Sequence, residues 1–140
     1  MSQMYRQIII DRFKNPQYRG TLENPDIAHG DENISCGDKI TFYIRLGQDH
    51  TVEEVSYDGR GCTISLASAD ILAETLEEMT LEEIRDLDSN FMLDLLGIKI
   101  TPTRTKCAIL GLKVVQAGVN LYHEFGRDGA LTALKEKNGT

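Results

Sequence analysis

The first hydrophobic pattern along the chain is helical, and the next two are extended. Residues 3–14 carry apolar side chains at an approximate helical period that ends before Pro16, which predicts a short amphipathic helix. The stretch 15–33 is rich in Asn, Asp, Pro and Gly and keeps no period, so we interpret it as irregular. Residues 39–46 alternate between apolar and polar, and 51–58 continue the alternation, so together they predict an antiparallel hairpin with one buried face.

Helical patterns dominate the second half of the chain. After a predicted strand break at residues 59–61, a long helical period covers 62–76, and another covers 107–125. Between them, residues 80–83 have the sequence of a capping box, which predicts the start of a short helix. Residues 97–104 are interpreted as a connector, so both long helices are predicted to begin at a cysteine. Shorter helical segments are expected at residues 91–96 and 130–135.

The order of these patterns, strands first and helices afterwards, predicts an α+β fold. We expect a small antiparallel sheet of about three strands packed against two long helices, with a short N-terminal helix and additional short helices. A chain of 140 residues has the length of one domain, so residues 1–140 are expected to form a single domain. Gly111 and Gly118 lie on one face of the last long helix and are expected to mark close packing.

Composition and charge narrow the classes of function. Fifteen Lys and Arg against twenty-two Asp and Glu give a net charge of −7, which repels phosphate backbones and anionic lipids. Nucleic acid and membranes are therefore not expected as partners. The chain shows no apolar run long enough for a membrane span and no signal-peptide pattern at its start, so we expect a cytoplasmic protein. Three cysteines without a short repeated spacing favour reduced thiols over a disulfide framework.

The motif Cys36-Gly37-Asp38 places a thiol and a carboxylate on either side of a glycine, whose conformational freedom lets both face one object. Cys62 and Cys107 stand at predicted helix starts, where the helix dipole favours a thiolate. Lys106 and Arg104 would favour the thiolate of Cys107 further. Burial as a small apolar side chain is the alternative role for each cysteine.

Three thiolates and one carboxylate can close a tetrahedral zinc site or hold a small iron–sulfur cluster. The spacing of the cysteines matches no zinc-ribbon or ferredoxin pattern, so both alternatives stay open. If iron is bound, a carboxylate is a poorer partner than a thiolate and favours release, which suits a carrier. An imidazole ligand could also come from His29, His50 or His123. A surface position is the favoured explanation for His50, in a predicted turn, and for His123, near a helix end, and nothing singles out His29.

Three ordered segments carry a family resemblance: Cys36-Gly37-Asp38, Gly61-Cys62-Thr63-Ile64-Ser65 and Lys106-Cys107-Ala108-Ile109-Leu110. Together they resemble the U-type iron–sulfur cluster assembly scaffolds, the family of IscU, SufU and the N-terminal domain of NifU. The similarity runs through nearly the whole chain, beginning with Tyr5, Ile9 and Asn15-Pro16.

The resemblance implies a site formed by Cys36, Asp38, Cys62 and Cys107 that holds a transient [2Fe–2S] cluster or Zn²⁺. It also implies three kinds of partner: a cysteine desulfurase, which is a pyridoxal-phosphate enzyme that delivers persulfide sulfur, an iron donor, and acceptor apo-proteins. The persulfide acceptor would be Cys107 in an IscU-like mechanism or Cys36 in a SufU-like one.

Two positions depart from the IscU pattern. Lys106 stands where many IscU-type members have a histidine, and residues 100–104 replace the Leu-Pro-Pro-Val-Lys motif that a dedicated chaperone reads, which argues against a chaperone interaction. The pair Lys106-Cys107 and nearby Arg104 are SufU-like, although the longer segment between the second and third cysteines of SufU proteins is missing. We expect a non-enzymatic scaffold, with a zinc-dependent sulfurtransferase as the alternative and a purely structural zinc protein as the third hypothesis.

Overall fold

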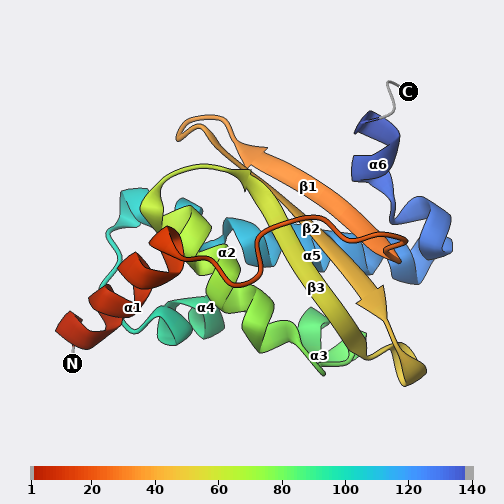
Figure 1. Ribbon diagram of the computed structural model, residues 1–140, viewed down its shortest axis with the longest axis horizontal. Coiled ribbons are helices and arrows are strands. Elements are labelled where there is room, and N and C mark those ends of the chain that lie inside the picture. The colour runs from red at the N-terminus through yellow and green to blue at the C-terminus, as the bar shows by residue number, and fades with distance from the viewer. Residues whose placement is uncertain (1, 138–140) are drawn as a thin grey trace.

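The computed structural model describes residues 2–137 and contains a three-stranded antiparallel sheet with two long helices on one face (Figure 1). The strands are β1 (Ile27–Asn33), β2 (Asp38–Leu46) and β3 (Val52–Arg60), in the order β1-β2-β3. The helices α2 (Thr63–Leu76) and α5 (Pro102–Gly129) pack against each other and against the sheet. The predicted α+β fold is confirmed.

The predicted hairpin is formed by β2, the central strand of the sheet, and β3, an edge strand. β2 pairs with β1 on one side and with β3 on the other, both antiparallel. Its alternating residues Ile40, Phe42 and Ile44 are buried, as the pattern predicts. Phe42 contacts Tyr57 of β3, with 5.9 Å between ring centroids. The apolar face of β2 therefore provides the sheet's part of the core.

Two glycines bring α5 close to the sheet. A Cβ atom at Gly111 would lie 3.2 Å from the ring of Phe42, and one at Gly118 would lie 2.8 Å from a methyl group of Ile27. Real Cβ atoms rarely tolerate such distances, so the missing side chains permit the close approach. The close packing expected at these positions is confirmed.

Two predictions about the strands are wrong. The stretch 15–33 is not irregular throughout, because β1 occupies its last seven residues. The strand lacks an alternating pattern because it lies at the sheet edge, where only Ile27 and Ala28 are buried. The expected strand break is also wrong, since β3 continues through Gly59 and Arg60. Gly59 fits this position because a Cβ there would collide with the carbonyl oxygen of Lys39 on β2.

The short helices α3 (Leu81–Arg85) and α4 (Ser89–Leu96) form close to where the sequence predicts them. The capping box is confirmed: the Thr80 hydroxyl accepts a hydrogen bond from the Glu83 amide at 3.1 Å, and the Thr80 amide donates to the Glu83 carboxylate at 2.9 Å. The predicted segment 91–96 begins earlier, because Asp88 caps the helix through the Phe91 amide. The remaining helices are α1 (Ser2–Lys14) and α6 (Thr132–Lys137).

Helix α5 begins five residues earlier than predicted, at Pro102 rather than Cys107. The backbone amide of the first helical residue has no hydrogen-bond partner within the helix, so proline, which has no amide hydrogen, fits this position without loss. Pro102 therefore starts this helix instead of ending a connector. Cys107 is consequently more than one turn inside the helix. Its place at a helix start is a wrong prediction, whereas Cys62 does form the N-cap of α2.

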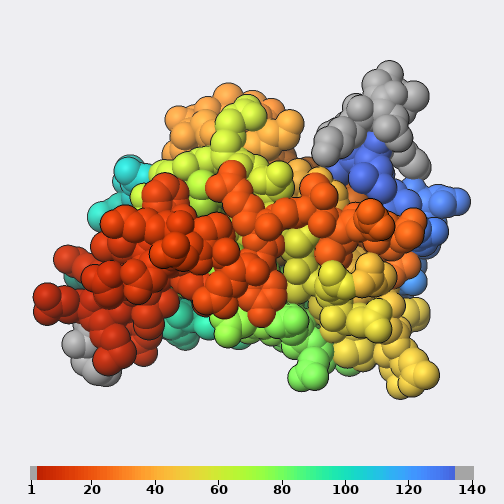
Figure 2. All heavy atoms as spheres, in the orientation of Figure 1, coloured from red at the N-terminus to blue at the C-terminus, as the bar shows by residue number. Residues whose placement is uncertain are grey.

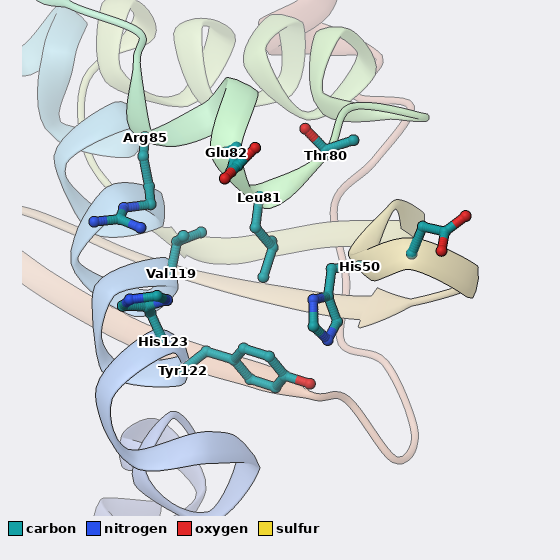
Figure 3. A pocket seen from close by; sticks show the side chains of 9 residues that line it. His50, Thr80, Leu81, Glu82, Arg85, Val119, Tyr122 and His123 are labelled. Carbon is teal, nitrogen blue, oxygen red and sulfur yellow. The ribbon is translucent and has the colours of Figure 1, made fainter.

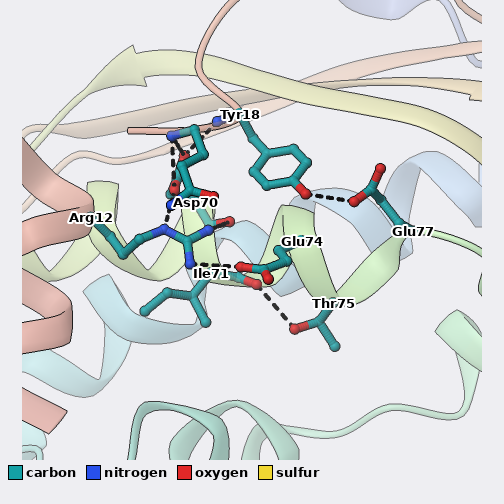
Figure 4. Close-up of polar contacts among 8 residues, drawn as sticks. Arg12, Tyr18, Asp70, Ile71, Glu74, Thr75 and Glu77 are labelled. Atoms are coloured by element: carbon teal, nitrogen blue, oxygen red, sulfur yellow. Dashed lines mark hydrogen bonds and ion pairs between the residues drawn. The ribbon is translucent and has the colours of Figure 1, made fainter. Parts of the chain in front are cut away.

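A buried carboxylate on α2 holds the N-terminal part of the chain in place (Figure 4). Asp70 is 0 % exposed and accepts hydrogen bonds from the Arg12 guanidinium at 2.5 Å and from the amides of Gln17 and Tyr18 at 3.0 and 2.9 Å. Arg12 also bonds Glu74 at 2.7 Å. A buried charge needs such partners, so Asp70 fixes both α1 and the segment that follows it.

The segment 15–26 links α1 to β1. It runs along the free edge of β3, where backbone hydrogen bonds join Gly20 to Tyr57 at 2.7 Å and Tyr57 to Tyr18 at 3.1 Å. In Figures 1 and 2 this red to orange segment lies in front of the strands, on the side away from α5.

Among the helices of the described residues, none has the length and apolar character that a bilayer span requires.

Candidate metal centre

Cys36 lies on the turn that joins β1 to β2. The carbonyl oxygen of Asn33 accepts hydrogen bonds from the amides of Cys36 at 3.1 Å and Gly37 at 2.9 Å, which closes the turn. Gly37 has φ +75°, a left-handed conformation that glycine adopts without steric cost. The turn leaves the Cys36 thiol exposed to solvent.

Asp38, the first residue of β2, is completely buried and has two different carboxylate oxygens. Oδ1 accepts hydrogen bonds from the Cys62 amide and the Ser65 hydroxyl, both at 3.1 Å. Oδ2 is buried without a hydrogen-bond partner among the residues that the structure describes. Because an unpartnered buried carboxylate oxygen is costly, a cation at Oδ2 would remove a destabilising feature of the fold.

The fold brings Cys36, Asp38 and Cys107 together. One ligand atom from each, two Sγ atoms and a carboxylate oxygen, lie within 4.8 Å of one another. They come from a turn, a strand and a helix, and Cys107 is only 1 % exposed. Two sulfur donors and one oxygen suit zinc or iron, so the residues present fit a metal ion of this kind.

Cys62 is outside this group of three but adjacent to it. Its Sγ lies 3.7 Å from the Ser65 hydroxyl, and its thiol interacts with that of Cys107. The preceding Gly61 permits this arrangement, since a Cβ there would lie 2.4 Å from Ser65 Oγ and 2.5 Å from Asp38 Oδ1.

The two inner thiols have opposite electrostatic environments. Burial disfavours the charged form of Cys62, but hydrogen bonds from the amide and hydroxyl of Ser65 outweigh it and lower the pKa of Cys62. Burial, followed by the interaction with Asp38, raises the pKa of Cys107. The expected preference for thiolate therefore holds at Cys62 and is wrong at Cys107, whose proton a bound metal ion would displace.

Two cations stand on the solvent side of the centre. Arg104 is exposed, and the charges of Cys62 and then Cys107 raise the pKa of its guanidinium. Lys106 and Cys36 border an open hollow of about 420 Å³, which Pro102 and Thr103 also line. Lys106 can therefore contact an anionic molecule that approaches the exposed thiol, and Arg104 stands near the two inner thiols.

The histidines lie elsewhere. None of them joins a potential metal-binding group in the described part of the chain, and His29 Nδ1 is 2.7 Å from the hydroxyl of Thr132. Sequence reasoning did not assign a role to Ser65, although its hydroxyl contacts both Asp38 and Cys62. Its position three residues after Cys62, in the first turn of α2, is the signal that could have identified it.

Comparisons with known proteins agree with this fold. Residues 4–127 match the family model of the NifU-like N-terminal domain. The chain is 32 % identical to the zinc-dependent sulfurtransferase SufU of Bacillus subtilis, over 83 % of this chain and 89 % of that one. It is 33 % identical to the iron–sulfur cluster assembly scaffold protein IscU of Thermotoga maritima, over 81 % of this chain and 90 % of that one.

A solved structure supports the same relationship. A SufU-type scaffold protein for the SUF system from Fervidobacterium islandicum superimposes with a TM-score of 0.70 at 28 % identity, covering 84 % of this chain and 98 % of that chain. The similarity therefore spans the sheet, the long helices and the segments that carry the cysteines.

Proposed function

This chain belongs to the NifU-like N-terminal domain family, and from that premise we propose that it is an iron–sulfur cluster assembly scaffold. It accepts sulfur from a cysteine desulfurase and iron from a donor, assembles a labile [2Fe–2S] cluster and transfers it to acceptor apo-proteins. The proposed ligands are Cys36, Asp38, Cys62 and Cys107. Iron and sulfide are cargo in this function, and the protein supplies the donors that hold them.

The unpartnered Oδ2 atom of Asp38 carries the proposal. It belongs to a buried carboxylate that has one oxygen within 4.8 Å of two cysteine sulfurs, and an unpartnered buried oxygen is unfavourable for an isolated fold and favourable once a cation is present. A single carboxylate among thiolates also explains why binding would be temporary, because oxygen is the harder and poorer ligand for cluster iron. The donor set thus supports a carrier more than a permanent electron-transfer centre.

Sulfur transfer needs an accessible thiolate. That thiolate attacks the outer sulfur of the persulfide on the desulfurase, forms a new S–S bond and releases the desulfurase thiolate, with no net redox change. Exposure supports Cys36 as the acceptor, since Cys107 is 1 % exposed. Arg104 and Lys106, close to the same surface, would stabilise the negative charge of the persulfide.

Cluster formation then requires electrons. Two ferrous ions and two sulfane sulfurs become an oxidised [2Fe–2S] cluster when the ions give up two electrons and an external electron donor supplies two more. The buried side of the centre, formed by Asp38 and Cys107, shields the product from water.

Anaerobic reconstitution with a desulfurase, cysteine, a reductant and ferrous iron tests this function. We expect a coloured protein with stoichiometric iron and sulfide, and slower cluster transfer from Asp38→Ala, because the readily exchanged oxygen ligand is lost. Asp58→Ala, which changes an exposed strand carboxylate, is the matched control. A colourless product with all three thiols free would contradict the proposal.

The alternative is a zinc-dependent sulfurtransferase, which the exposure of Cys36 favours. In this function Zn²⁺ would organise the four proposed ligands, and Cys36 would accept the persulfide without cluster assembly. It predicts tightly bound zinc and faster desulfurase turnover when the protein is added. If iron forms a stable cluster and zinc only inhibits, the scaffold function is correct and the sulfurtransferase is not.

A further inference from the structure

A separate cavity of about 460 Å³ lies at the other end of the sheet (Figure 3). β2 begins at Asp38 and ends at Leu46, and the β2–β3 turn that follows lines the cavity together with α3 and the second half of α5. Nine residues of strand span roughly 30 Å, so the cavity is remote from the cysteines. Its volume is within the usual range for small-molecule sites.

The cavity has an apolar base and an aromatic wall. Leu81 is 8 % exposed and Val119 0 %, so both present methyl groups from the core. The ring of Tyr122 meets the His50 imidazole edge-on, with 5.7 Å between ring centroids. A ligand in this space would therefore bury an apolar or aromatic body.

Nitrogen donors stand at one end of the cavity. In Figure 3 the guanidinium of Arg85 and the imidazole of His123 point toward the same end, near Val119. Arg85 forms no ion pair or hydrogen bond with the residues that the structure describes. A guanidinium without a partner, beside an apolar base, is a suitable donor for a planar carboxylate.

Two acidic residues restrict the charge of the ligand. Glu82 and Asp49 also line the cavity, and both are exposed. Together with a chain charge of −7, they would repel polyanions such as nucleotides. The combination of one guanidinium, two carboxylates and an apolar base selects a monoanion with an apolar body over phosphate.

Two residues that line the cavity have a left-handed backbone conformation, which indicates a role for their side chains. Asp49 and His50 have φ of +57° and +55°, which glycine would adopt more easily. This conformation carries the His50 ring against Tyr122 on α5 and closes one side of the cavity.

We propose that this cavity binds a small organic monocarboxylate, with its carboxylate on Arg85 and His123 and its apolar body over Leu81, Val119 and Tyr122. The site is independent of the cysteines, so a metal ion at one end of the sheet and a carboxylate at the other can be bound together.

Titration of the ¹⁵N-labelled full chain with benzoate tests the site. We expect saturable amide shifts in α3, the β2–β3 turn and the second half of α5, with a dissociation constant in the millimolar range that is usual for so small a ligand. Arg85→Gln should weaken binding about tenfold or more, because a charge-assisted hydrogen bond is lost. Arg6→Gln removes the same charge from an exposed position on α1 and should leave binding unchanged.

Inorganic phosphate, added in place of benzoate, should give no saturable shifts at these amides. His123→Gln provides a second variant if Arg85→Gln does not fold, and it should also weaken benzoate binding. The proposal is overturned by unsaturable or scattered shifts, by equal affinity in the Arg85 and Arg6 variants, or by phosphate binding as tightly as benzoate.

Discussion

The two carboxylate oxygens of Asp38 have different environments. Oδ1 is held by the Cys62 amide and the Ser65 hydroxyl, so the side chain cannot rotate freely, and Oδ2 is left without a hydrogen-bond partner among the described residues. A metal ligand that is oriented by neighbouring hydrogen bonds binds more tightly than a mobile one. Ser65 is therefore a positioning residue for the proposed centre.

Ser65→Ala should weaken zinc binding about tenfold, because Asp38 loses one of the two bonds that orient it. Competition with a chromophoric chelator measures the affinity. Ser68→Ala is the matched control, since this serine is also buried on α2 and its hydroxyl has no partner among the described residues. Equal affinity of the two variants would show that Ser65 does not position the ligand.

Persulfide should form first on Cys36. We expect mass spectrometry, after incubation with a desulfurase and cysteine in the absence of iron, to find the added sulfur on this thiol. Cys107→Ser should retain the modification because the buried thiol is inaccessible, whereas Cys36→Ser should lose it. Modification of Cys107 in the Cys36→Ser variant at the original rate would contradict this assignment.

The residues of the proposed centre could be named from the sequence, but the differences in their solvent exposure could not. Motif resemblance is sufficient to select Cys36, Asp38, Cys62 and Cys107. The exposure of Cys36 and the burial of Cys107 depend on how a turn and a helix meet, which no local pattern records. The role of Ser65 likewise depends on contact with a strand far away in the sequence.

At the scale of elements, Arg12 on α1 forms ion pairs with Asp70 and Glu74 on α2. Arg12 is the only charged side chain that bonds Asp70 among the described residues, and the Asp70 carboxylate is fully buried. Arg12→Met should lower the free energy of unfolding by about 3 kcal/mol, because it leaves a buried charge without its counter-ion. Denaturant unfolding measures the change.

The matched control for Arg12→Met is Arg6→Met, on the same helix but exposed and without an ion pair among the described residues. It should change stability by less than about 0.5 kcal/mol. Similar losses in both variants would mean that helix propensity, rather than the pair with Asp70, explains the effect.

Elements with a strong period were predictable, and those defined by neighbours were not. β2 and α2 carry their own patterns of apolar residues. β1 has a polar second half and becomes a strand through its pairing with β2. A proline can either break a helix or occupy its first position, and the sequence around Pro102 does not distinguish the two. In the structure Pro102 is the first residue of α5.

For the molecule as a whole, two tyrosines whose pKa values are raised predict a loss of stability at alkaline pH. Burial, followed by the charge of Asp70, raises the pKa of Tyr57, and the hydrogen bond to Glu77 raises that of Tyr18 to about 12. Both are raised above the ordinary value of 10.0, so their contribution is complete below pH 10 and is lost as the pH rises through the folded-state values.

The free energy of unfolding should therefore decrease between about pH 10 and 12. Tyr57→Phe should reduce this decrease, because phenylalanine has no proton to lose. Urea unfolding at several pH values, followed by far-UV circular dichroism, measures both effects. A decrease of the same size in Tyr57→Phe would assign the alkaline transition to other groups.

The hydrogen-bonded turn of residues 34–37 has a consequence for the order in which ligands exchange. Asp38 and Cys107 are anchored in a strand and a helix, whereas Cys36 can move with a short turn and leave the rest of the fold intact. An incoming thiolate from an acceptor would therefore enter beside Cys36, whose turn can move aside, and replace the Asp38 oxygen, the more readily exchanged ligand, while the cysteine sulfurs still hold the cargo. Handover would then proceed without free metal ever entering solution.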